Sequence, residues 1–196
     1  MMKLTTTVAL GAALFALGAC NKDGNANGMG NAQTSEAKQA AGNKTIAAGL
    51  DANGKFMAAA KAAGLDQTLA GPGPYTVIVA DDAAFTALPA GTYDNWLKPE
   101  NRAQLTGVMT NMILPGTVLA EDISKAIDAG KGKAVLATMG GGTLTATKVG
   151  DKIVLTSADG QKATVTKADD KFTNGVVQHV DAVLMPGKSG AATPAG

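Results

Sequence analysis

The chain has 196 residues, 45% of them hydrophobic, with 17 Lys and Arg against 16 Asp and Glu. This length fits one globular domain with appendages, and a nearly neutral charge without a basic run excludes a nucleic acid as the expected partner. A single Cys and a single His exclude disulfide frameworks and zinc clusters, and we expect no cofactor.

Residues 1–19 have the composition of a secretory signal peptide. A positive charge at Lys3 precedes an apolar stretch from Val8 to Leu17, which is too short to cross a membrane. The segment Leu17-Gly18-Ala19-Cys20 resembles a bacterial lipobox, in which cleavage before the cysteine is followed by lipidation of its thiol. The resemblance implies an exported lipoprotein anchored to a membrane through Cys20, in the outer membrane, the periplasm or at the cell surface.

The segments that flank the central region predict no packed structure. Residues 20–44 begin at the lipidated cysteine and are rich in Asn, Gly, Ala and Gln, which predicts a flexible tether. Residues 187–196 have no apolar period and predict a disordered tail. The periodic apolar signal is confined to residues 45–186, which we interpret as one folded domain.

The first part of this domain predicts helices around one strand. An apolar helical face spans residues 56–63, and Gly64 ends that helix. A buried strand at 75–79 then precedes a helix that Asp81 or Asp82 can cap.

A further helix begins at Pro99 and ends at Leu114-Pro115-Gly116. Apolar residues recur along it at the spacing of one buried stripe, formed by Leu105, Val108, Met109 and Met112.

The last third of the domain predicts strands. After a short helix with Ile123 and Ile127, four β-rich runs are separated by turn residues, at 143–145, 153–156, 164–166 and 176–177. Helices followed by strands predict an α+β domain in which helices pack on a mostly antiparallel β-sheet wedge or sandwich.

Three motifs in this order resemble the fasciclin domain, a secreted or surface-anchored module. They are residues 76–85, the series from Leu88-Pro89 to Leu114-Pro115-Gly116, and residues 174–186. The resemblance covers residues 45–186. It implies the fasciclin fold and a non-enzymatic role in cell adhesion through binding of a protein or glycan.

Two departures from the family pattern mark candidate interaction residues. A Tyr-His pair that the family often carries is Asn111-Met112 here, followed by Ile113, and in animal members this region is linked to integrin binding. The helical spacing favours core packing for Met112. The family's Val-Ile-His run is Val177-Gln178-His179, which moves the imidazole to the other face of the strand. We therefore mark Asn111, Met112, Ile113 and His179.

No catalytic, cofactor-binding or metal-binding set is expected. His179 and Asp181 would share one face of a strand, where the carboxylate could orient the imidazole as a general base, but no nucleophile accompanies them. Asp81-Asp82 and Asp169-Asp170 are interpreted as helix caps and solvated turn residues. We interpret His179 as structural, with a hydrolase based on His179 and Asp181 as the weakest alternative.

Two binding hypotheses remain. In the first, the protein is a lipid-anchored surface or periplasmic module that binds an unidentified protein or glycan. In the second, a crevice between the Ala- and Met-rich helices and the sheet holds an apolar small molecule such as a lipid or pigment, since the chain's 8 Met residues can form adaptable walls.

Overall fold

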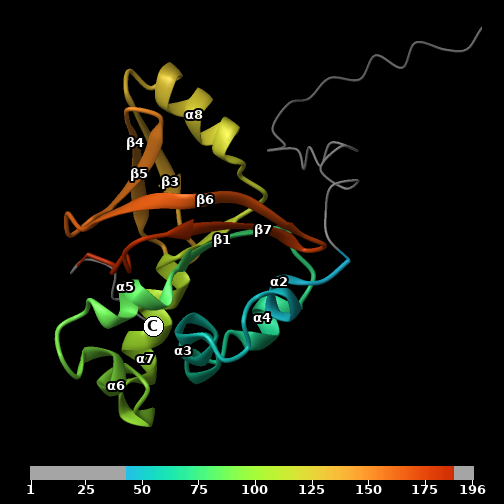
Figure 1. Cartoon of the computed structure of the whole chain (residues 1–196), viewed down its shortest axis with the longest axis vertical. Coiled ribbons are helices and arrows are strands. Elements are labelled where there is room, and N and C mark those ends of the chain that lie inside the picture. The colour runs from blue at the N-terminus through green and yellow to red at the C-terminus, as the bar shows by residue number, and fades with distance from the viewer. Residues whose placement is uncertain (1–42, 188–196) are drawn as a thin grey trace, which may run out of the picture. The chain divides into compact units, whose positions relative to one another are not determined.

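The computed structural model describes residues 43–187 (Figure 1). The predicted signal peptide, Cys20, and all but the ends of the predicted tether and tail lie outside these residues. Between residues 43 and 187, no helix has both the length and the apolar character that crossing a membrane requires.

The first part of the chain forms helices before and after the single strand β1, and the second part forms mainly strands. The helical elements are α2 (Ile46–Gly49), α3 (Lys55–Ala63), α4 (Asp66–Ala70), α5 (Asp82–Thr86), α6 (Thr92–Trp96), the 3-10 helix η1 (Pro99–Asn101), α7 (Arg102–Asn111) and α8 (Ala120–Ala129). The strands are β1 (Tyr75–Ala80), β2 (Ile113–Pro115), β3 (Lys133–Ala137), β4 (Thr143–Val149), β5 (Lys152–Ser157), β6 (Lys162–Phe172) and β7 (Gly175–Val180).

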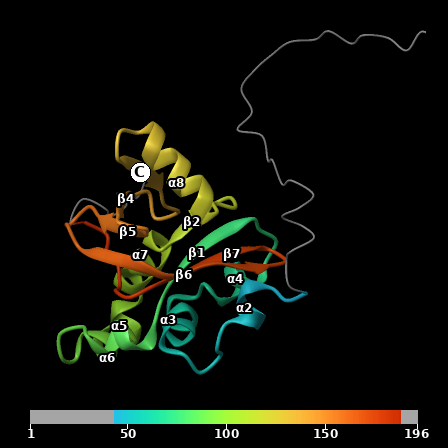
Figure 2. The ribbon, with the colours of Figure 1, turned by 45° about the horizontal axis from the view of Figure 1, so that its top comes forward.

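The strands form one seven-stranded sheet in the order β2-β1-β7-β6-β5-β4-β3. Strands β1 and β7 are parallel, and every other neighbouring pair is antiparallel. Figures 1 and 2 show α2 to α5 gathered near β1 and β7, with α6 farther from these strands, whereas α8 lies beside β3, β4 and β5. The predicted α+β fold with a mostly antiparallel sheet is therefore confirmed.

The helical periods of the sequence correspond to real buried faces. In α3 the predicted face is buried, and Gly64 ends the helix in the left-handed conformation, with a φ of 78°. The stripe predicted along α7 is also buried throughout, with exposures of 0–3% at Leu105, Val108, Met109 and Met112. Core packing of Met112 is thus confirmed.

Two strands were not predicted from the sequence. The segment expected only to end α7 forms β2, which pairs with β1 over three residues. Strand β3, with the sequence Lys-Ala-Val-Leu-Ala, pairs with β4 although its Val135 is 67% exposed. A three-residue strand shows no period, and an exposed Val between Ala and Leu hides the alternation that marks a strand.

The two edges of the sheet meet at a seam. The Met139 backbone N–H, just beyond β3, donates to the Ile113 carbonyl of β2 at 2.7 Å. The Gly140 N–H donates to the Thr110 carbonyl at 3.1 Å. These bonds bring the first and last strands of the sheet order together and bury the end of α7 between them.

A second junction is built around the buried side chain of Asn174, between β6 and β7. Its amide oxygen accepts from the Ile46 N–H at 2.8 Å, and its amide nitrogen donates to the carbonyls of Leu69 and Gly71 at 2.8 and 2.9 Å. The Tyr75 N–H at the start of β1 donates to the Asn174 backbone carbonyl at 3.1 Å. One residue therefore ties α2, α4 and β1 to the β6–β7 turn.

We expect Asn174→Ala to lower the free energy of unfolding by roughly 2–4 kcal/mol, because three buried backbone groups lose their partners. Urea denaturation of the full chain measures this difference. Asn53→Ala, at an exposed loop position, is the matched control and should change stability little. Equal midpoints for the two variants would contradict the assigned role of Asn174.

Candidate functional site

Three of the four predicted interaction residues are not on the surface. Asn111, Met112 and Ile113 are only 2%, 0% and 1% exposed, because they lie where the two sheet edges meet. The Asn111 amide oxygen accepts from the Thr138 hydroxyl at 3.3 Å, and its nitrogen donates to the Leu184 carbonyl at 3.4 Å. An exposed contact surface at these three positions is therefore wrong: their side chains close the sheet.

The fourth candidate, His179, lines a pocket of about 170 Å³ near the ends of β1 and β7. Its side chain is 19% exposed and has a carboxylate beside each ring nitrogen. Nδ1 lies 3.7 Å from Asp81 Oδ1, and Nε2 lies 3.4 Å from Asp170 Oδ2. The imidazole thus links the start of α5 to β6 and β7.

The pairing of His179 with Asp181 that the sequence suggested is wrong. Strand β7 ends at Val180, and the Asp181 carboxylate turns to the neighbouring strand, where it accepts from the Thr164 N–H at 2.6 Å. The two carboxylates that contact His179 come from other elements. A catalytic pair of His179 and Asp181 is therefore not assembled.

The paired aspartates at the start of α5 also differ from the expectation. Asp81 occupies the N-cap position without a side-chain capping bond and faces His179 instead. Asp82 Oδ1 accepts from the Lys55 N–H at 2.9 Å, at the first residue of α3. The capping group therefore serves a different helix, and both carboxylates line the pocket of His179.

Asp169 and Asp170 are part of β6 and not of a turn, where register shifts interrupt its pairing with β7. Asp169 Oδ1 accepts from the Ala120 N–H at 2.9 Å, at the start of α8, and from the buried Gln178 amide at 2.7 Å. Gln178 and His179 thus contact Asp169 and Asp170 respectively, from opposite faces of β7. His179 therefore lies on the other face of β7 from Gln178.

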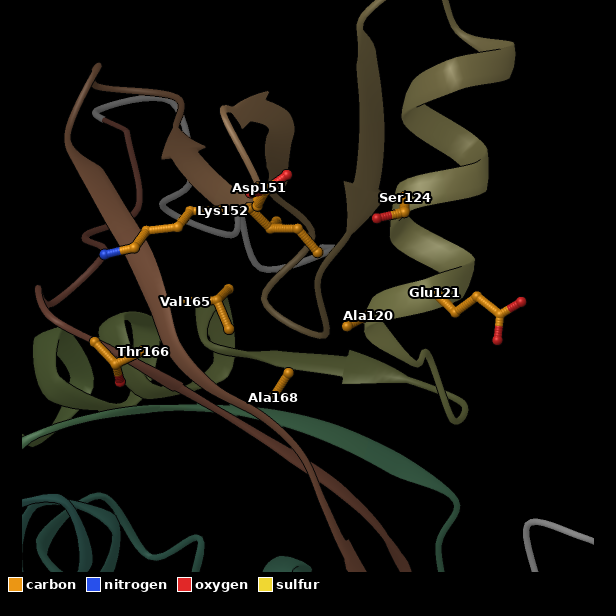
Figure 3. Close-up of a pocket in the computed structure, with 9 residues that line it drawn as sticks. Ala120, Glu121, Ser124, Asp151, Lys152, Val165, Thr166 and Ala168 are labelled. Carbon is orange, nitrogen blue, oxygen red and sulfur yellow. The ribbon is translucent and has the colours of Figure 1, made fainter.

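A larger cleft of about 360 Å³ lies between the start of α8 and strands β5 and β6. In Figure 3, Ala120, Val165 and Ala168 face the hollow, while the charged ends of Glu121 and Lys152 point away from it. The lining residues come from α8, the β4–β5 turn, β5 and β6. No sequence motif marks this cleft, because its lining residues come from separate elements.

No group of three or more His, Cys, Asp or Glu side chains in residues 43–187 is arranged to hold a metal ion. Every buried side-chain nitrogen or oxygen in this range has a hydrogen-bond partner. The polar groups inside the domain are therefore used within the fold itself.

Comparison with known proteins gives the family. The family profile described as "Fasciclin domain" matches residues 53–186. The chain belongs to the fasciclin domain family. The chain is 36% identical to Protein sll1483 of Synechocystis sp. over 141 residues, which cover 72% of this chain and 71% of that protein.

Two further matches are to animal proteins. The chain is 34% identical over 130 residues to transforming growth factor-beta-induced protein ig-h3 of Sus scrofa, covering 66% of this chain and 17% of that protein. A solved fasciclin domain pair from the insect cell adhesion molecule Fasciclin I superposes with a TM-score of 0.63 and 14% identity. That match covers 72% of this chain and 51% of the solved chain, and it supports the fold.

The fasciclin motifs lie side by side in the structure. Strand β1 contains the start of the first motif, β7 contains much of the last, and the two strands pair in parallel from Tyr75–Gly175 to Ala80–Val180. Segments about 100 residues apart thus form the centre of the fasciclin domain. The residues that carry the resemblance are mainly structural.

The pKa of Asp170 is set by opposing effects. Burial alone would raise this pKa, but hydrogen bonds from Lys167 and His179, together with their charges, outweigh burial and hold it below the usual range. The Lys167 Nζ atom lies 3.0 Å from Asp170 Oδ2. The ionised carboxylate therefore stabilises the folded domain.

We expect Asp170→Asn to be less stable than the parent at neutral pH, with the difference shrinking under acid conditions. A lowered folded-state pKa stabilises the fold above the unfolded-state value of about 3.9, and this contribution is lost as the pH falls through the folded-state value. Urea denaturation from pH 7 to pH 3 measures it, with Asp94→Asn as the exposed control. A stability difference that is the same at every pH would refute the assignment.

Proposed function

We propose that this protein is an exported, lipid-anchored fasciclin module that acts by binding in the cell envelope, in adhesion or envelope organisation. The observation that supports it most is the membership of the fasciclin family, with relatives that include ig-h3 and the adhesion molecule Fasciclin I. The lipobox resemblance at Cys20 supports anchoring, and the tether composition supports a domain held away from the lipid surface.

A binding role without catalysis fits the way the domain uses its polar side chains. His179 is held between two carboxylates, and Asp181 and Asp82 accept backbone N–H groups of neighbouring elements. These groups stabilise the fold and leave no assembled nucleophile and base among the described residues. The outer surface of the domain is then the part available to a partner.

Deletion of the gene is expected to lower surface attachment and cell–cell aggregation. Complementation with the parent gene should restore both, whereas a Cys20→Ala gene should not, because its product would lack the lipid anchor. Crystal-violet attachment assays and membrane fractionation of the two complemented strains measure this. Unchanged attachment in the deletion strain, or full restoration by Cys20→Ala retained in the membrane, would refute the proposal.

The cleft beside α8 favours a second candidate function, the binding of an apolar small molecule. Its volume of about 360 Å³ lies at the lower end of the range of ligand sites. Its apolar lining residues are Ala120, Ile153, Val165 and Ala168, and polar or charged residues form the rest of the wall. Native mass spectrometry of the full chain purified from its own cells would show retained ligand mass.

We expect Ala168→Phe to narrow the cleft and weaken binding of the apolar probe N-phenyl-1-naphthylamine several-fold, because the new ring occupies the site. Fluorescence titration of the full chain measures this, and Ala52→Phe, at an exposed loop, is the control. Equal probe affinity in both variants would exclude the cleft as the ligand site.

A further inference from the structure

The sheet has an open face at β3, β4, β5 and the start of β6. Alternate residues of these strands are buried toward α8, among them Ala134, Leu144, Ala146, Leu155 and Ala163. The intervening residues point to the opposite face, where Figure 1 shows none of the labelled helices. We call this surface the outer β face; it consists of Lys133, Val135, Ala137, Thr143, Thr145, Thr147, Val149, Lys152, Val154, Thr156, Lys162 and Thr164.

The outer β face is positively charged although the chain as a whole is nearly neutral. Three of its residues are Lys, five are Thr, and none is Asp or Glu. All three lysines are exposed. Within residues 43–187, the ion pairs involve Lys125, Lys148, Lys167 and His179, so none of the three outer-face lysines is neutralised by a carboxylate.

The strand register separates the three lysines across the face. Lys133 lies in the row Lys133–Thr147–Val154–Thr164, Lys162 lies in the next row with Val135, Thr145 and Thr156, and Lys152 pairs with Val149. Strand spacing and residue rise place them roughly 10–15 Å apart, with threonine and valine side chains between them. The charge is therefore spread evenly and sparsely.

Protection of an edge strand accounts for only one of the three lysines. A lysine on an edge strand prevents pairing with another chain, and this explanation fits Lys133 on β3. Lys152 and Lys162 lie on the interior strands β5 and β6, where each of the two residues pairs on one side only, with Val149 and Thr156 respectively. Neither of these two lysines lies on an edge strand of the sheet.

We propose that the outer β face binds an anionic polysaccharide, with the lysines contacting its acidic groups and the threonine hydroxyls contacting its sugar hydroxyls. Protein–protein interfaces are enriched in aromatic residues, Met and Arg and depleted in Lys. The outer β face contains three Lys and no aromatic residue, Met or Arg. Duplex DNA carries a charge about every 1.7 Å, far denser than these lysines. The charge density of a polysaccharide with about one carboxylate per sugar is lower than that of DNA. It therefore matches widely spaced lysines between threonine hydroxyls better than DNA does.

This inference rests on the proposed binding function and is tested separately from it. Binding of the full chain to immobilised alginate, a polyuronate, is measured by biolayer interferometry at 50 mM salt. Neutral dextran and duplex DNA are the comparison polymers. The test variant is Lys133→Gln/Lys152→Gln/Lys162→Gln, and the control is Lys44→Gln/Lys61→Gln/Lys125→Gln, which removes the same charge from exposed positions elsewhere.

We expect the test variant to lose roughly tenfold or more in alginate affinity, and the control variant to stay close to the parent, because only the first removes charges at the contact. Circular dichroism and urea denaturation confirm that both remain folded. A further variant, Thr145→Glu, keeps all lysines and should also weaken alginate binding through repulsion. Affinity should fall steeply with added salt.

Equal alginate affinity of the test and control variants would overturn the inference, as would tighter binding to dextran or DNA than to alginate. Neither result would contradict the adhesion proposal, because the deletion-strain assay tests that proposal without reference to any polymer. Conversely, the test variant could lose alginate binding while deletion of the gene leaves attachment unchanged. That combination would support the site on the outer β face and refute the adhesion role.

Discussion

The close contact between β1 and the β6–β7 turn is the constraint on which the domain depends. Asn174 satisfies three backbone groups of the helical part and accepts the first N–H of β1, so β1 begins where the turn ends. At Gly175, a Cβ atom would clash with the Tyr75 carbonyl oxygen, and only glycine allows this approach. The parallel pairing of β1 with β7 then fixes the helices relative to the strands.

From this junction, a series of polar contacts positions the remaining parts. Thr76 on β1 accepts from the Val118 N–H and donates to the Gly116 carbonyl, both at 2.8 Å, which orients the segment before α8. On β7, Gln178 holds Asp169, which in turn caps α8. The helix that covers one face of the β3–β5 region is thus set by residues of β1, β6 and β7. That placement leaves the outer β face uncovered.

Elements whose apolar period repeats over several turns were predictable from the sequence. Contacts between residues far apart in the chain were not. The faces of α3 and α7 repeat over several turns, so Phe56 and Leu105 were correctly placed in the core. Asn111 and Ile113 were marked because they lie where the family resemblance implies an interaction motif. Nothing in the neighbouring sequence reveals that the Met139 N–H binds β2 across the seam. The partners of His179, Asp81 and Asp170, are 98 and 9 residues away in the chain and could not be predicted from spacing.

The domain separates structural from surface functions by sheet face. The faces that meet helices use the polar residues Asn174, Gln178 and Thr76 to satisfy backbone groups, and a substitution there acts mainly on stability. The outer β face differs, because the strand propensity of its β-branched threonines and valines does not depend on which other side chains lie beside them. Its lysines can therefore change without cost to the fold, and this freedom lets a rigid fasciclin scaffold present a surface suited to one partner.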